Sequence, residues 1–588
     1  MRLKIVFCLL FLVSSVSLAQ EYKPYNTFNK EAELQRFVAQ GGKVEEISPN
    51  IYRLTNIIGE SRTFYLGSKE DVNGSMEYVD TTILNIWEID TIKFNNMFRF
   101  WQKVEVANSW WTSLPTADLN NNNRPELYGY TDIIYPNLIG PVKIFERNLN
   151  GNYENIFSYD FNTSKVDGIT DINRDGIKEM IILSIIDEDS TLYYHPIFKS
   201  DTVNSLPSTF DLFLNIDSLD FPFDLYQIYN MVFGDWNNNG KTECAFTTIG
   251  TWDTTMCMIA EYNDSINNFE KTFQFSSIYE SDLSGFAIND FDQDEKTELV
   301  ISSGPGNVFV IENISENQYS IINQFPFPIH NTYMQTVTND IDENGKPEFW
   351  IGGQDYVNGI TVFQCYEFDG DNNYQVVAYI ELRYLVSLFN EYIQAVDIDD
   401  DKKEELIISI GNVILILKFG GFPNNHQYKL WYAKLGESTQ PGAQFYPVSI
   451  ADLDGDSKKD LLIPMEKYTS WITYAFSYIL RSDGTSSIEF SESNKFFLEE
   501  YIKSYPVPFN SYSSIRFAIS DESLVKIKVY SALGKEIKTL LEEQLSPGEY
   551  DIHWEAKDKY GKPLTSGIYF ISLQTKNVVK TIKTILLK

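Results

Sequence analysis

The sequence predicts an all-β protein built from repeated groups of strands, and three observations carry this prediction. A ten-residue acidic pattern, of which "DINRDGIKEM" from Asp171 is one copy, occurs seven times. Short apolar runs of strand type follow the copies, such as "MIILSII" after Glu179. Tyrosine and phenylalanine, which favour strands, number 37 and 40 against 9 methionines. The repeated unit therefore consists of strands, not helices.

The seven copies are regularly spaced along most of the chain. Their first residues are Asp118, Asp171, Asp235, Asp290, Asp340, Asp397 and Asp452, so successive copies start 50 to 64 residues apart. Each unit has room for about four strands, and a four-stranded unit repeated radially is the blade of a β-propeller. A single blade would leave both faces apolar and its edges unpaired, whereas a ring of blades covers them. We therefore predict a seven-bladed β-propeller.

Residues before the first copy complicate the number of blades. Residues 51–106 contain three further runs of strand type, "RTFYLG", "TTILNIWEI" and "MFRFWQKVEV", without the acidic pattern. They predict either a degenerate eighth blade or the strand that closes the ring, and the sequence does not decide between the two. Lys30 to Gln40 predicts a short helix that ends at Gly41-Gly42. The predicted propeller spans residues 51–500, after an N-terminal segment of residues 20–50.

The acidic pattern has the chemistry of a calcium loop. Its positions 1, 3 and 5 carry side-chain oxygen, position 6 is often glycine, and position 9 is Glu or Asp. Ca²⁺ takes six to eight oxygen ligands, and a tight loop can direct alternate side chains and one backbone carbonyl toward one centre. Mg²⁺ fits less well because it requires stricter octahedral geometry. The sequence therefore predicts Ca²⁺ as the cofactor, at up to about seven sites.

The candidate metal ligands are the residues at positions 1, 3, 5 and 9 of every copy. In chain order they are Asp118, Asn120, Asn122 and Glu126; Asp171, Asn173, Asp175 and Glu179; Asp235, Asn237, Asn239 and Glu243; Asp290, Asp292, Asp294 and Glu298; Asp340, Asp342, Asn344 and Glu348; Asp397, Asp399, Asp401 and Glu405; and Asp452, Asp454, Asp456 and Asp460. Asp and Asn also form polar turns without a metal. Repeated crowding of carboxylates argues for a cation, because like charges this close raise one another's pKa.

Position 6 differs among the copies. Glu295 and Lys402 stand there in two of them, where glycine would be easiest to accommodate, so strain is expected in those two loops.

The pattern resembles the FG-GAP or VCBS-type repeats of secreted and surface propellers, which include the head of the integrin α-subunit. The resemblance covers roughly residues 114–491. It implies a propeller whose loops bind Ca²⁺ between adjacent strands, and it implies no particular function.

The N-terminus predicts export. Arg2 and Lys4 precede the apolar run Ile5 to Val13, and the small residues before Gln20 suit a signal peptidase, so residues 1–19 are a predicted signal peptide. No later run has the roughly 20 consecutive apolar residues of a transmembrane helix. We therefore expect a secreted or surface protein.

Residues 501–588 predict a second domain, a small immunoglobulin-like β-sandwich. Alternating strands are separated by glycines, and Ser504 to Lys588 contains 12 Lys and Arg against 9 Asp and Glu, unlike the acidic repeats. The motifs "YPVPFN", "GKPLTSGIYFISL" and "KTIKTILLK" resemble the C-terminal sorting domain of proteins exported by the type IX secretion system. Val507 stands where the family usually has asparagine. The resemblance implies the type IX machinery as a partner; the alternative is an ordinary immunoglobulin-like domain.

Charge and missing motifs narrow the function. A net charge of −35 argues against nucleic acid as a partner. The sequence contains no GxSxG elbow, HExxH pair or phosphate-binding glycine loop. The four histidines, His195, His330, His426 and His553, lie far apart without metal-ligand spacing, and we interpret each as a surface or structural residue. We therefore expect no catalytic residues, and a non-catalytic binding or adhesion module for a glycan or protein. The alternatives are an extracellular polysaccharide-degrading enzyme built on a propeller, or an architectural surface component.

The tryptophans and the cysteines allow two further predictions. Aromatic side chains could supply the binding surface, although each is more often blade packing; the candidates are Trp110, Trp111, Trp236, Trp252 and Trp350. Three cysteines remain after signal cleavage, and Cys244 and Cys257 could either pair across neighbouring strands or be buried thiols.

Overall fold

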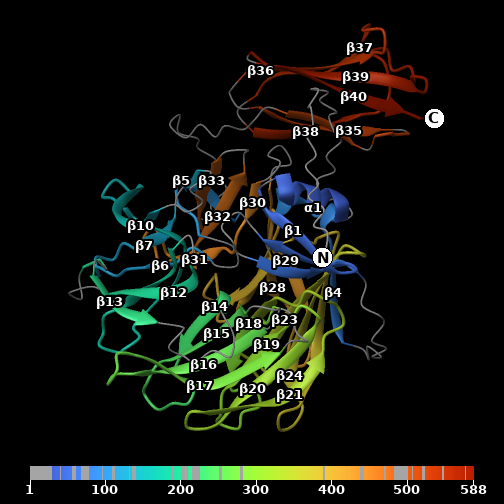
Figure 1. Cartoon of the computed structure of the whole chain (residues 1–588). Helices are drawn as coiled ribbons and strands as arrows, with labels where there is room; N and C mark the ends of the chain where they lie inside the picture. The colour runs from blue at the N-terminus through green and yellow to red at the C-terminus, as the bar shows by residue number, and fades with distance from the viewer. Residues whose placement is uncertain are drawn as a thin grey trace, which may run out of the picture. The chain divides into compact units, whose positions relative to one another are not determined.

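The structure is a computed structural model of the whole chain. It describes residues 30–39, 41–55, 61–67, 79–95, 97–108, 113–130, 133–134, 141–187, 190–199, 205–206, 209–214, 225–250, 255–277, 282–388, 391–436, 443–468, 472–482, 501–505, 507–510, 512–519, 523–545, 548–576 and 578–587. The predicted signal peptide, residues 1–19, lies outside these residues. The chain divides into two compact units, Met1–Thr485 and Ser486–Lys588. Both are built almost entirely of strands (Figure 1), as predicted for an all-β protein.

Two units of the repeat share one long strand. The 18-residue strand β10 pairs with β9 through its first half and with β11 through its second half. The resulting seven-stranded sheet has the order β13-β12-β11-β10-β9-β7-β6. Its strands are β6 (Thr116–Ala117), β7 (Glu126–Tyr130), β9 (Pro141–Arg147), β10 (Tyr153–Thr170), β11 (Glu179–Asp187), β12 (Ser190–Lys199) and β13 (Thr209–Leu214).

The next four copies each lie within a four-stranded antiparallel meander. Each acidic loop connects the first strand of its sheet to the second. The strands are β14 (Leu225–Gly234), β15 (Glu243–Gly250), β16 (Thr255–Asn263) and β17 (Asn268–Ser277); β18 (Ser284–Asn289), β19 (Glu298–Ser302), β20 (Asn307–Ser315) and β21 (Gln318–Pro326); β22 (Met334–Thr338), β23 (Glu348–Asp355), β24 (Ile360–Phe368) and β25 (Tyr374–Arg383); and β26 (Glu391–Val396), β27 (Glu405–Ile410), β28 (Val413–Phe419) and β29 (Tyr428–Leu435).

The last copy lacks a fourth strand of its own and receives one from the N-terminal part of the chain. Its sheet has the order β30-β32-β33-β5, with β31 paired to β32 and β8 paired to β33. These strands are β30 (Ala443–Phe445), β31 (Ser449–Ala451), β32 (Asp460–Tyr468), β33 (Ile472–Arg481), β5 (Arg99–Val104) and β8 (Ile133–Ile134).

The described strands of residues 51–106 do not form a sheet of their own, so the eighth-blade alternative is wrong. Strand β3 (Ser61–Tyr65) lies in a sheet with β1 (Lys43–Ser48) and β2 (Ile51–Thr55). Strand β4 (Asp80–Asn85) adds to β25 in parallel, and β5 completes the last repeat. The three runs therefore serve three different sheets. Two short helical turns, η1 (Ile86–Glu88) and α2 (Thr91–Phe94), lie between β4 and β5.

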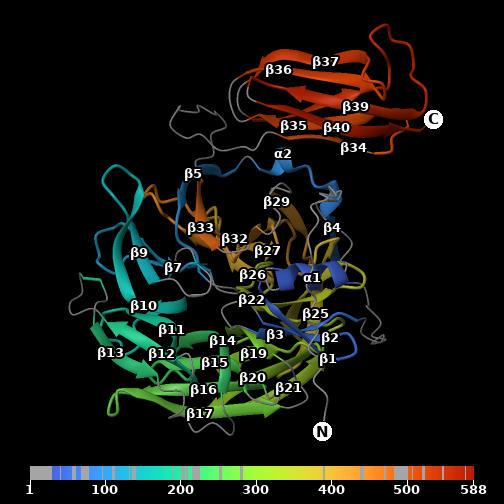
Figure 2. The ribbon, with the colours of Figure 1, turned by 45° about the horizontal axis from the view of Figure 1, so that its top comes forward.

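Successive repeat sheets pack face to face, because neighbouring residues of one strand point to opposite faces. Trp350 on β23 packs in one core with Leu406 of the next sheet, whereas the adjacent Phe349 packs with Val300 of the preceding sheet. Similar buried clusters join each other pair of consecutive sheets. One more cluster joins the last repeat to the first, with Leu462 against Leu127. Figure 2 shows these sheets side by side.

The N-terminal sheet β1–β3 is anchored on the loops between the repeats. Helix α1 (Lys30–Ala39), where the sequence predicts a short helix, packs beside it in a cluster that includes Tyr356 of the repeat region. The buried Arg62 of β3 forms an ion pair with the buried Glu391. Tyr65 and Asn331 exchange two hydrogen bonds of 3.0 Å. These contacts give the N-terminal segment a structural role.

The cysteines of the described residues, Cys244, Cys257 and Cys365, are buried thiols. Cys244 lies opposite Ala260, and Cys257 lies opposite Thr247, on the neighbouring strands β15 and β16. The two cysteines point to opposite faces of the sheet, because one packs against the preceding repeat and the other against the following one. The buried-thiol alternative is therefore the one that the structure shows.

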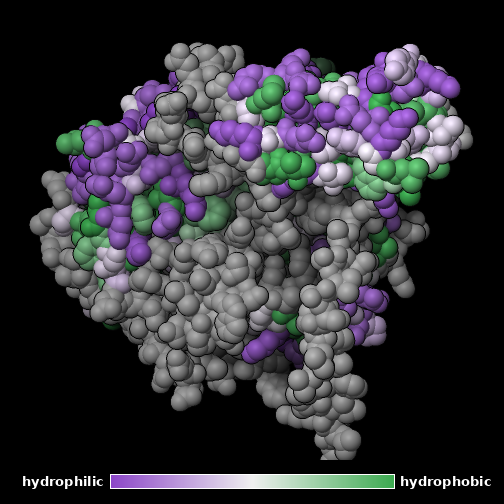
Figure 3. Space-filling view, turned by 90° about the horizontal axis from the view of Figure 1, so that it is seen from above, coloured by the Kyte–Doolittle hydropathy of each residue, from purple (hydrophilic) through white to green (hydrophobic). Residues whose placement is uncertain are grey.

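The second unit is a sandwich of two antiparallel sheets around one apolar core that includes the buried Trp554. One sheet has the order β34-β35-β38, and the other has the order β37-β36-β39-β40. The coloured residues in the view of Figure 3 are mostly hydrophilic, with hydrophobic residues in small groups. The strands are β34 (Tyr501–Tyr505), β35 (Ser513–Ile519), β36 (Ser523–Ser531), β37 (Glu536–Leu545), β38 (Gly548–Trp554), β39 (Gly567–Gln574) and β40 (Val579–Leu586).

Among the described residues, no helix is both long and apolar enough to cross a membrane.

Candidate functional site

All seven acidic loops share one backbone geometry. The residue at position 6 always has a positive φ, which ranges from 60° at Asn123 to 92° at Gly345. Its N–H donates to the side chain of the first Asp at 2.8 to 3.1 Å. The N–H of position 7 donates to the side-chain oxygen of position 5 at 2.9 Å in every copy. Glu295 and Lys402 adopt the same left-handed conformation, with φ of 71° and 73°, at the two positions where strain is predicted.

The ninth residue of each loop is a buried carboxylate at the start of the second strand. One of its oxygens accepts the N–H of position 2 at 2.5 to 3.1 Å in all seven copies. This bond closes the loop onto the strand and holds the carboxylate inside. Each of these side chains is at most 1% exposed; they are Glu126, Glu179, Glu243, Glu298, Glu348, Glu405 and Asp460.

In five loops the second oxygen of the ninth residue accepts no hydrogen bond. These buried atoms are Oε1 of Glu126, Glu179, Glu298, Glu348 and Glu405. In the other two loops, Glu243 accepts the hydroxyl of Tyr319 at 2.5 Å, and Asp460 accepts the N–H of Ser482 at 3.1 Å. A lysine ammonium lies 3.4 Å from this oxygen at Glu179 and at Glu405. A buried charged oxygen without a partner is costly, so the oxygens of Glu126, Glu298 and Glu348 lie where a further cation would stabilise them.

Burial raises the pKa of these carboxyls. The pKa rises to about 7 for Glu126 and Glu405, to about 8 for Glu298 and Glu348, and to about 6 for Asp460. Desolvation is the largest cause in each case, because water no longer stabilises the charged form. A divalent cation beside these oxygens would favour the charged form and reverse the shift.

A residue outside the ten-residue pattern faces each ninth residue across the following hairpin, and we call it the opposite residue. In four sheets it is a glutamate: Glu146, Glu261, Glu312 or Glu367. In the other three it is a base: Lys199, Lys418 or Arg481. We call the two classes glutamate-opposed and base-opposed loops. The class determines how much positive charge the protein itself supplies to the loop.

In the base-opposed loops the base contacts the predicted ligands directly. Lys418 Nζ lies 2.8 Å from Asp401 and 3.4 Å from Glu405, and it also pairs with Asp399. Lys199 contacts Asp175 at 2.5 Å and Glu179 at 3.4 Å. An ammonium group therefore lies among the oxygens that are predicted to hold calcium.

In three glutamate-opposed loops, the residue at position 7 is a base that pairs with the opposite glutamate. The pairs are Arg124 with Glu146 at 2.8 Å, Lys241 with Glu261 at 2.9 Å and Lys296 with Glu312 at 3.1 Å. These bases neutralise the opposite glutamate and leave the ninth carboxylate without a cationic partner. In the fourth loop, the corresponding Lys346 donates to the carbonyl of Phe368.

The structure brings the predicted ligands together unequally. Asp290, Asp292, Asp294 and Glu298 offer oxygens within 4.8 Å of one another. The same holds for Asp397, Asp399 and Glu405, and for Asp452, Asp454 and Asp460. In the fifth copy only Asp342 and Glu348 converge, together with Glu367 and His426. The first and third copies carry Asn at positions 3 and 5, so they offer amide oxygens in place of carboxylates.

Two predicted ligands of the fifth copy do not join its cluster. Asp340 has a positive φ of 53°, and both of its oxygens accept the N–H of Gly345 at 3.0 Å. Asn344 donates from its amide to Glu367 at 2.9 Å. Of the two sequence interpretations of His426, a surface or a structural residue, the first is wrong, because the side chain is buried within this cluster.

The tryptophan candidates for a binding surface are not supported where the structure describes them. Trp350 is fully buried and Trp236 is 8% exposed, and both pack in cores between repeat sheets. Trp110, Trp111 and Trp252 lie outside the described residues.

Comparisons with known proteins identify the second unit. Residues 503–588 match the family model described as a secretion system C-terminal sorting domain. No curated protein matches the chain. A solved structure with some similarity is PorZ of Porphyromonas gingivalis, described as an essential bacterial surface component of the type IX secretion system. It is 11% identical, the match covers 92% of this chain and 68% of PorZ, and the TM-score of 0.31 carries no argument about this protein. The C-terminal unit is thus a type IX secretion sorting domain, and the chain is a protein exported by that system to the cell surface or the extracellular space.

Proposed function

We propose that this exported protein is a non-catalytic binding module, in which a calcium-stabilised seven-bladed β-propeller of the FG-GAP or VCBS type binds a glycan or a protein outside the cell. The seven acidic loops carry the calcium part of the proposal. The order of the repeat sheets supports the propeller. The sorting domain supplies the route to the site of action.

The propeller interpretation rests on how the repeat sheets follow one another. Each copy contributes one set of strands, and buried clusters connect every set to the next, including the last set to the first. Strand β5 completes the last set, so the N-terminal part of the chain and the last repeat are hydrogen-bonded together. Pairing of this kind is what a closed ring requires.

The single observation behind calcium binding is the recurring buried carboxylate oxygen that accepts no hydrogen bond. Five ninth residues place such an atom at the end of the same hydrogen-bonded loop. At Glu179 and Glu405 this oxygen lies 3.4 Å from a lysine ammonium, whereas at Glu126, Glu298 and Glu348 the described residues supply no such cation. Carboxylate, amide and backbone oxygens at this spacing suit a hard divalent cation, and Ca²⁺ tolerates the irregular coordination that unequal copies offer. Calcium would therefore bind most strongly where carboxylates are most numerous and no base contacts the ninth residue, as in the loop that begins at Asp290, where Lys296 contacts Asp294 at 2.5 Å but not Glu298.

Removal of calcium tests this proposal. We expect EDTA to lower the melting temperature of the mature protein and Ca²⁺ to restore it, because a ligand that binds only the folded state stabilises it by mass action. Mg²⁺ at the same concentration should restore less. An identical melting curve in EDTA and in calcium would contradict calcium binding.

Two assays separate the binding module from its alternatives. Binding to a glycan array, or specific retention of an extracellular protein, should depend on calcium if the rigid repeat unit presents the contact surface. Turnover of any polysaccharide in a panel of substrates would favour the enzyme alternative. If the protein shows no binding and no turnover, the architectural alternative is favoured.

A further inference from the structure

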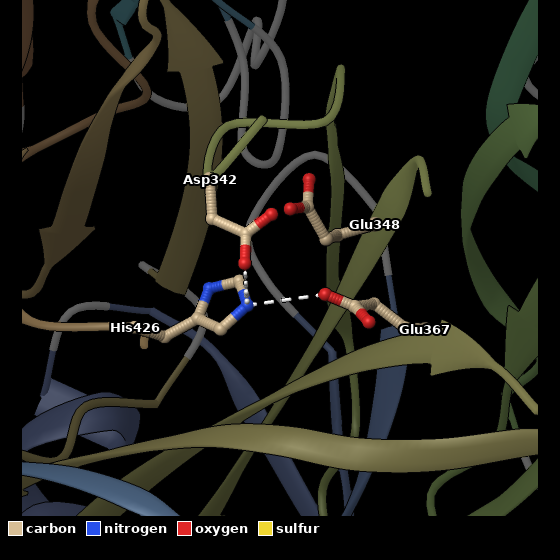
Figure 4. Close-up of side chains that lie close together, drawn as sticks. All are labelled: Asp342, Glu348, Glu367 and His426. Atoms are coloured by element: carbon tan, nitrogen blue, oxygen red, sulfur yellow. Dashed lines mark hydrogen bonds and ion pairs between the residues drawn. The ribbon is translucent and has the colours of Figure 1, made fainter. Parts of the chain in front are cut away.

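One of the acidic loops has a ligand set unlike the others. Asp342 in the loop after β22, Glu348 at the start of β23, Glu367 at the end of β24 and His426 between β28 and β29 point toward one another (Figure 4). Each offers one ligand atom within 4.8 Å of the rest, and all four side chains are buried. His426 Nε2 lies 3.1 Å from Glu367 and 3.4 Å from Asp342. The set therefore contains one nitrogen and three carboxylates.

The histidine is held in this cluster by contacts from two directions. The hairpin residue Asn424 donates its N–H to Asp342 at 2.5 Å. Asp80 of β4 accepts the N–H of His426 at 2.6 Å and the amide of Asn425 at 3.2 Å. The hairpin belongs to one repeat sheet and Asp342 to the preceding one, so His426 completes a site that spans two repeats. Such bracing positions a ligand before any metal binds.

The cluster also lacks the charge compensation found at the other loops. Among the residues that the structure describes, no lysine or arginine forms an ion pair with Asp342, Glu348 or Glu367, whereas each of the other six loops has at least one such pair at its carboxylates or its opposite glutamate. Glu348 Oε1, fully buried, accepts no hydrogen bond. Three buried carboxylates beside one imidazole leave an excess of negative charge, which is costly without a further cation.

The donor atoms select the class of metal. Ca²⁺ and Mg²⁺ take oxygen ligands, whereas an imidazole nitrogen favours zinc and neighbouring transition metals. Four ligands, one nitrogen and three oxygens, match the number that Zn²⁺ requires in a closed structural site. We propose that Asp342, Glu348, Glu367 and His426 form a structural site for a divalent transition metal of the zinc class, distinct from the sites of the calcium loops. This site deepens the metal-binding part of the proposed function and rests on it.

A titration with Co²⁺, which is a coloured probe for zinc sites, tests the proposal on the mature full-length protein. The metal-free protein should be titrated in the presence of excess Ca²⁺, so that the oxygen-only loops are occupied. We expect one equivalent of Co²⁺ to produce visible absorption that saturates, and one equivalent of Zn²⁺ to abolish it. A wild-type protein that develops no saturable absorption and takes up no stoichiometric Zn²⁺ would overturn the proposal without any variant.

His426→Gln removes the nitrogen ligand and is the decisive variant. It should lose the absorption and the equivalent of zinc while keeping the rise in melting temperature on addition of Ca²⁺. The matched control His553→Gln, in the sorting domain, should keep both. Glu367→Gln, an isosteric change, should weaken zinc binding at least tenfold even if His426→Gln does not fold. Retention of full zinc binding by a folded His426→Gln protein, or by Glu367→Gln, would refute the site.

The calcium experiment and the zinc experiment can fail separately. Loss of the calcium effect with intact Co²⁺ absorption would contradict the calcium loops and keep the zinc-class site. An intact calcium effect with no Co²⁺ binding would contradict only the zinc-class site.

Discussion

The sheets β18–β21 and β26–β29 carry the same acidic loop but face it with opposite charges. In β18–β21 the opposite residue is Glu312, whose cationic partner is Lys296, and Glu298 Oε1 has no hydrogen bond. In β26–β29 the opposite residue is Lys418, which pairs with Asp399 and Asp401 and lies 3.4 Å from Glu405. The loop backbone is the same in both, with position 6 in the left-handed region. Loop geometry and loop charge are therefore set by different residues.

In both loops a lysine contacts the carboxylate at position 5, Lys296 at Asp294 and Lys418 at Asp401, but only Lys418 also contacts the ninth residue. The pKa of Glu298 rises to about 8, chiefly through burial, with nearby carboxylates adding to the rise. Burial also raises the pKa of Glu405, to about 7, and the N–H of Ile398 and the ammonium of Lys418 both oppose this rise. We therefore expect glutamate-opposed loops to bind calcium more tightly, and base-opposed loops to hold their shape in its absence.

Reversing the charge at Lys418 should have the largest effect on the free energy of unfolding. Lys418→Glu removes the base from the half-exposed Asp399 and Asp401 and from the fully buried Glu405, and leaving a buried charge without its partner costs about 3 kcal/mol. We expect that loss in the free energy of unfolding in EDTA, measured by urea denaturation. Saturating Ca²⁺ should recover most of it and add about one calcium per chain, as the loop changes class. Lys429→Glu, at an exposed position across from Lys418, is the control and should change neither quantity.

A neutral substitution of the ninth residue should have the second largest effect on stability. Glu298→Gln removes a charged ligand and should abolish the stabilisation that calcium provides at that loop, which amounts to about 2.7 kcal/mol at a calcium concentration 100 times Kd. Glu405→Gln, in the base-opposed loop, should remove less, because calcium stabilises that loop less. Denaturation with and without calcium measures both losses. Equal losses in the two variants would show that the opposite residue does not control calcium binding.

The pH dependence of the calcium-free protein should also follow the ninth residues. A carboxyl whose folded pKa is raised contributes stability below its unfolded pKa, about 4.5 for Glu298, and this stability is lost as pH rises through the folded value of about 8. In EDTA the free energy of unfolding should therefore fall between about pH 4.5 and about pH 8, by at most about 1.4 kcal/mol per pH unit for each carboxyl. Glu298→Gln should reduce the slope. Calcium should flatten it, and a slope unchanged by the substitution would contradict this assignment.

Substitutions at position 6 of the acidic loops should have the smallest effect on stability. Lys402 and Glu295 hold φ values of 73° and 71°, which glycine adopts without strain. Lys402→Gly should stabilise the protein by about 0.5 to 1 kcal/mol, in calcium and in EDTA alike, because the gain comes from the backbone. Glu295→Gly should behave in the same way in the other class of loop. The matched reverse change, Gly345→Ala, should destabilise at a φ of 92°. Thermal denaturation measures all three, and a gain that appears only with calcium would assign the effect to metal binding.

Much of the fold could be predicted because its signals are local. The acidic pattern and the apolar run after it mark where each first hairpin begins, and the glycine-punctuated strands mark the sorting domain. The positions of β3, β4 and β5 could not be predicted, because three runs of strand type carry no signal for the distant sheets that they join. The sharing of β10 by two repeats had no local signal either.

The candidate site was predictable only within the ten residues of the pattern. The opposite residues were missed because the intervening hairpin varies in length, from 12 residues between Glu405 and Lys418 to 20 between Asp460 and Arg481. A comparison of the copies beyond their ninth residue, as in "IENI" around Glu312 and "LKFG" around Lys418, offers the signal. His426 carried none, because it reaches Glu367 from the next repeat.

The pairing of β5 with β33 has a consequence for how the chain folds. Val104 lies beside Ser477, about 370 residues downstream, so the last repeat stays incomplete until a strand made early is joined by one made late. Contacts at such sequence separation form slowly, because the loop between them must first be ordered. The unpaired edge of β33 is an aggregation hazard during that interval. Folding of the repeats should therefore be completed only after synthesis has passed Arg481, as a single late step.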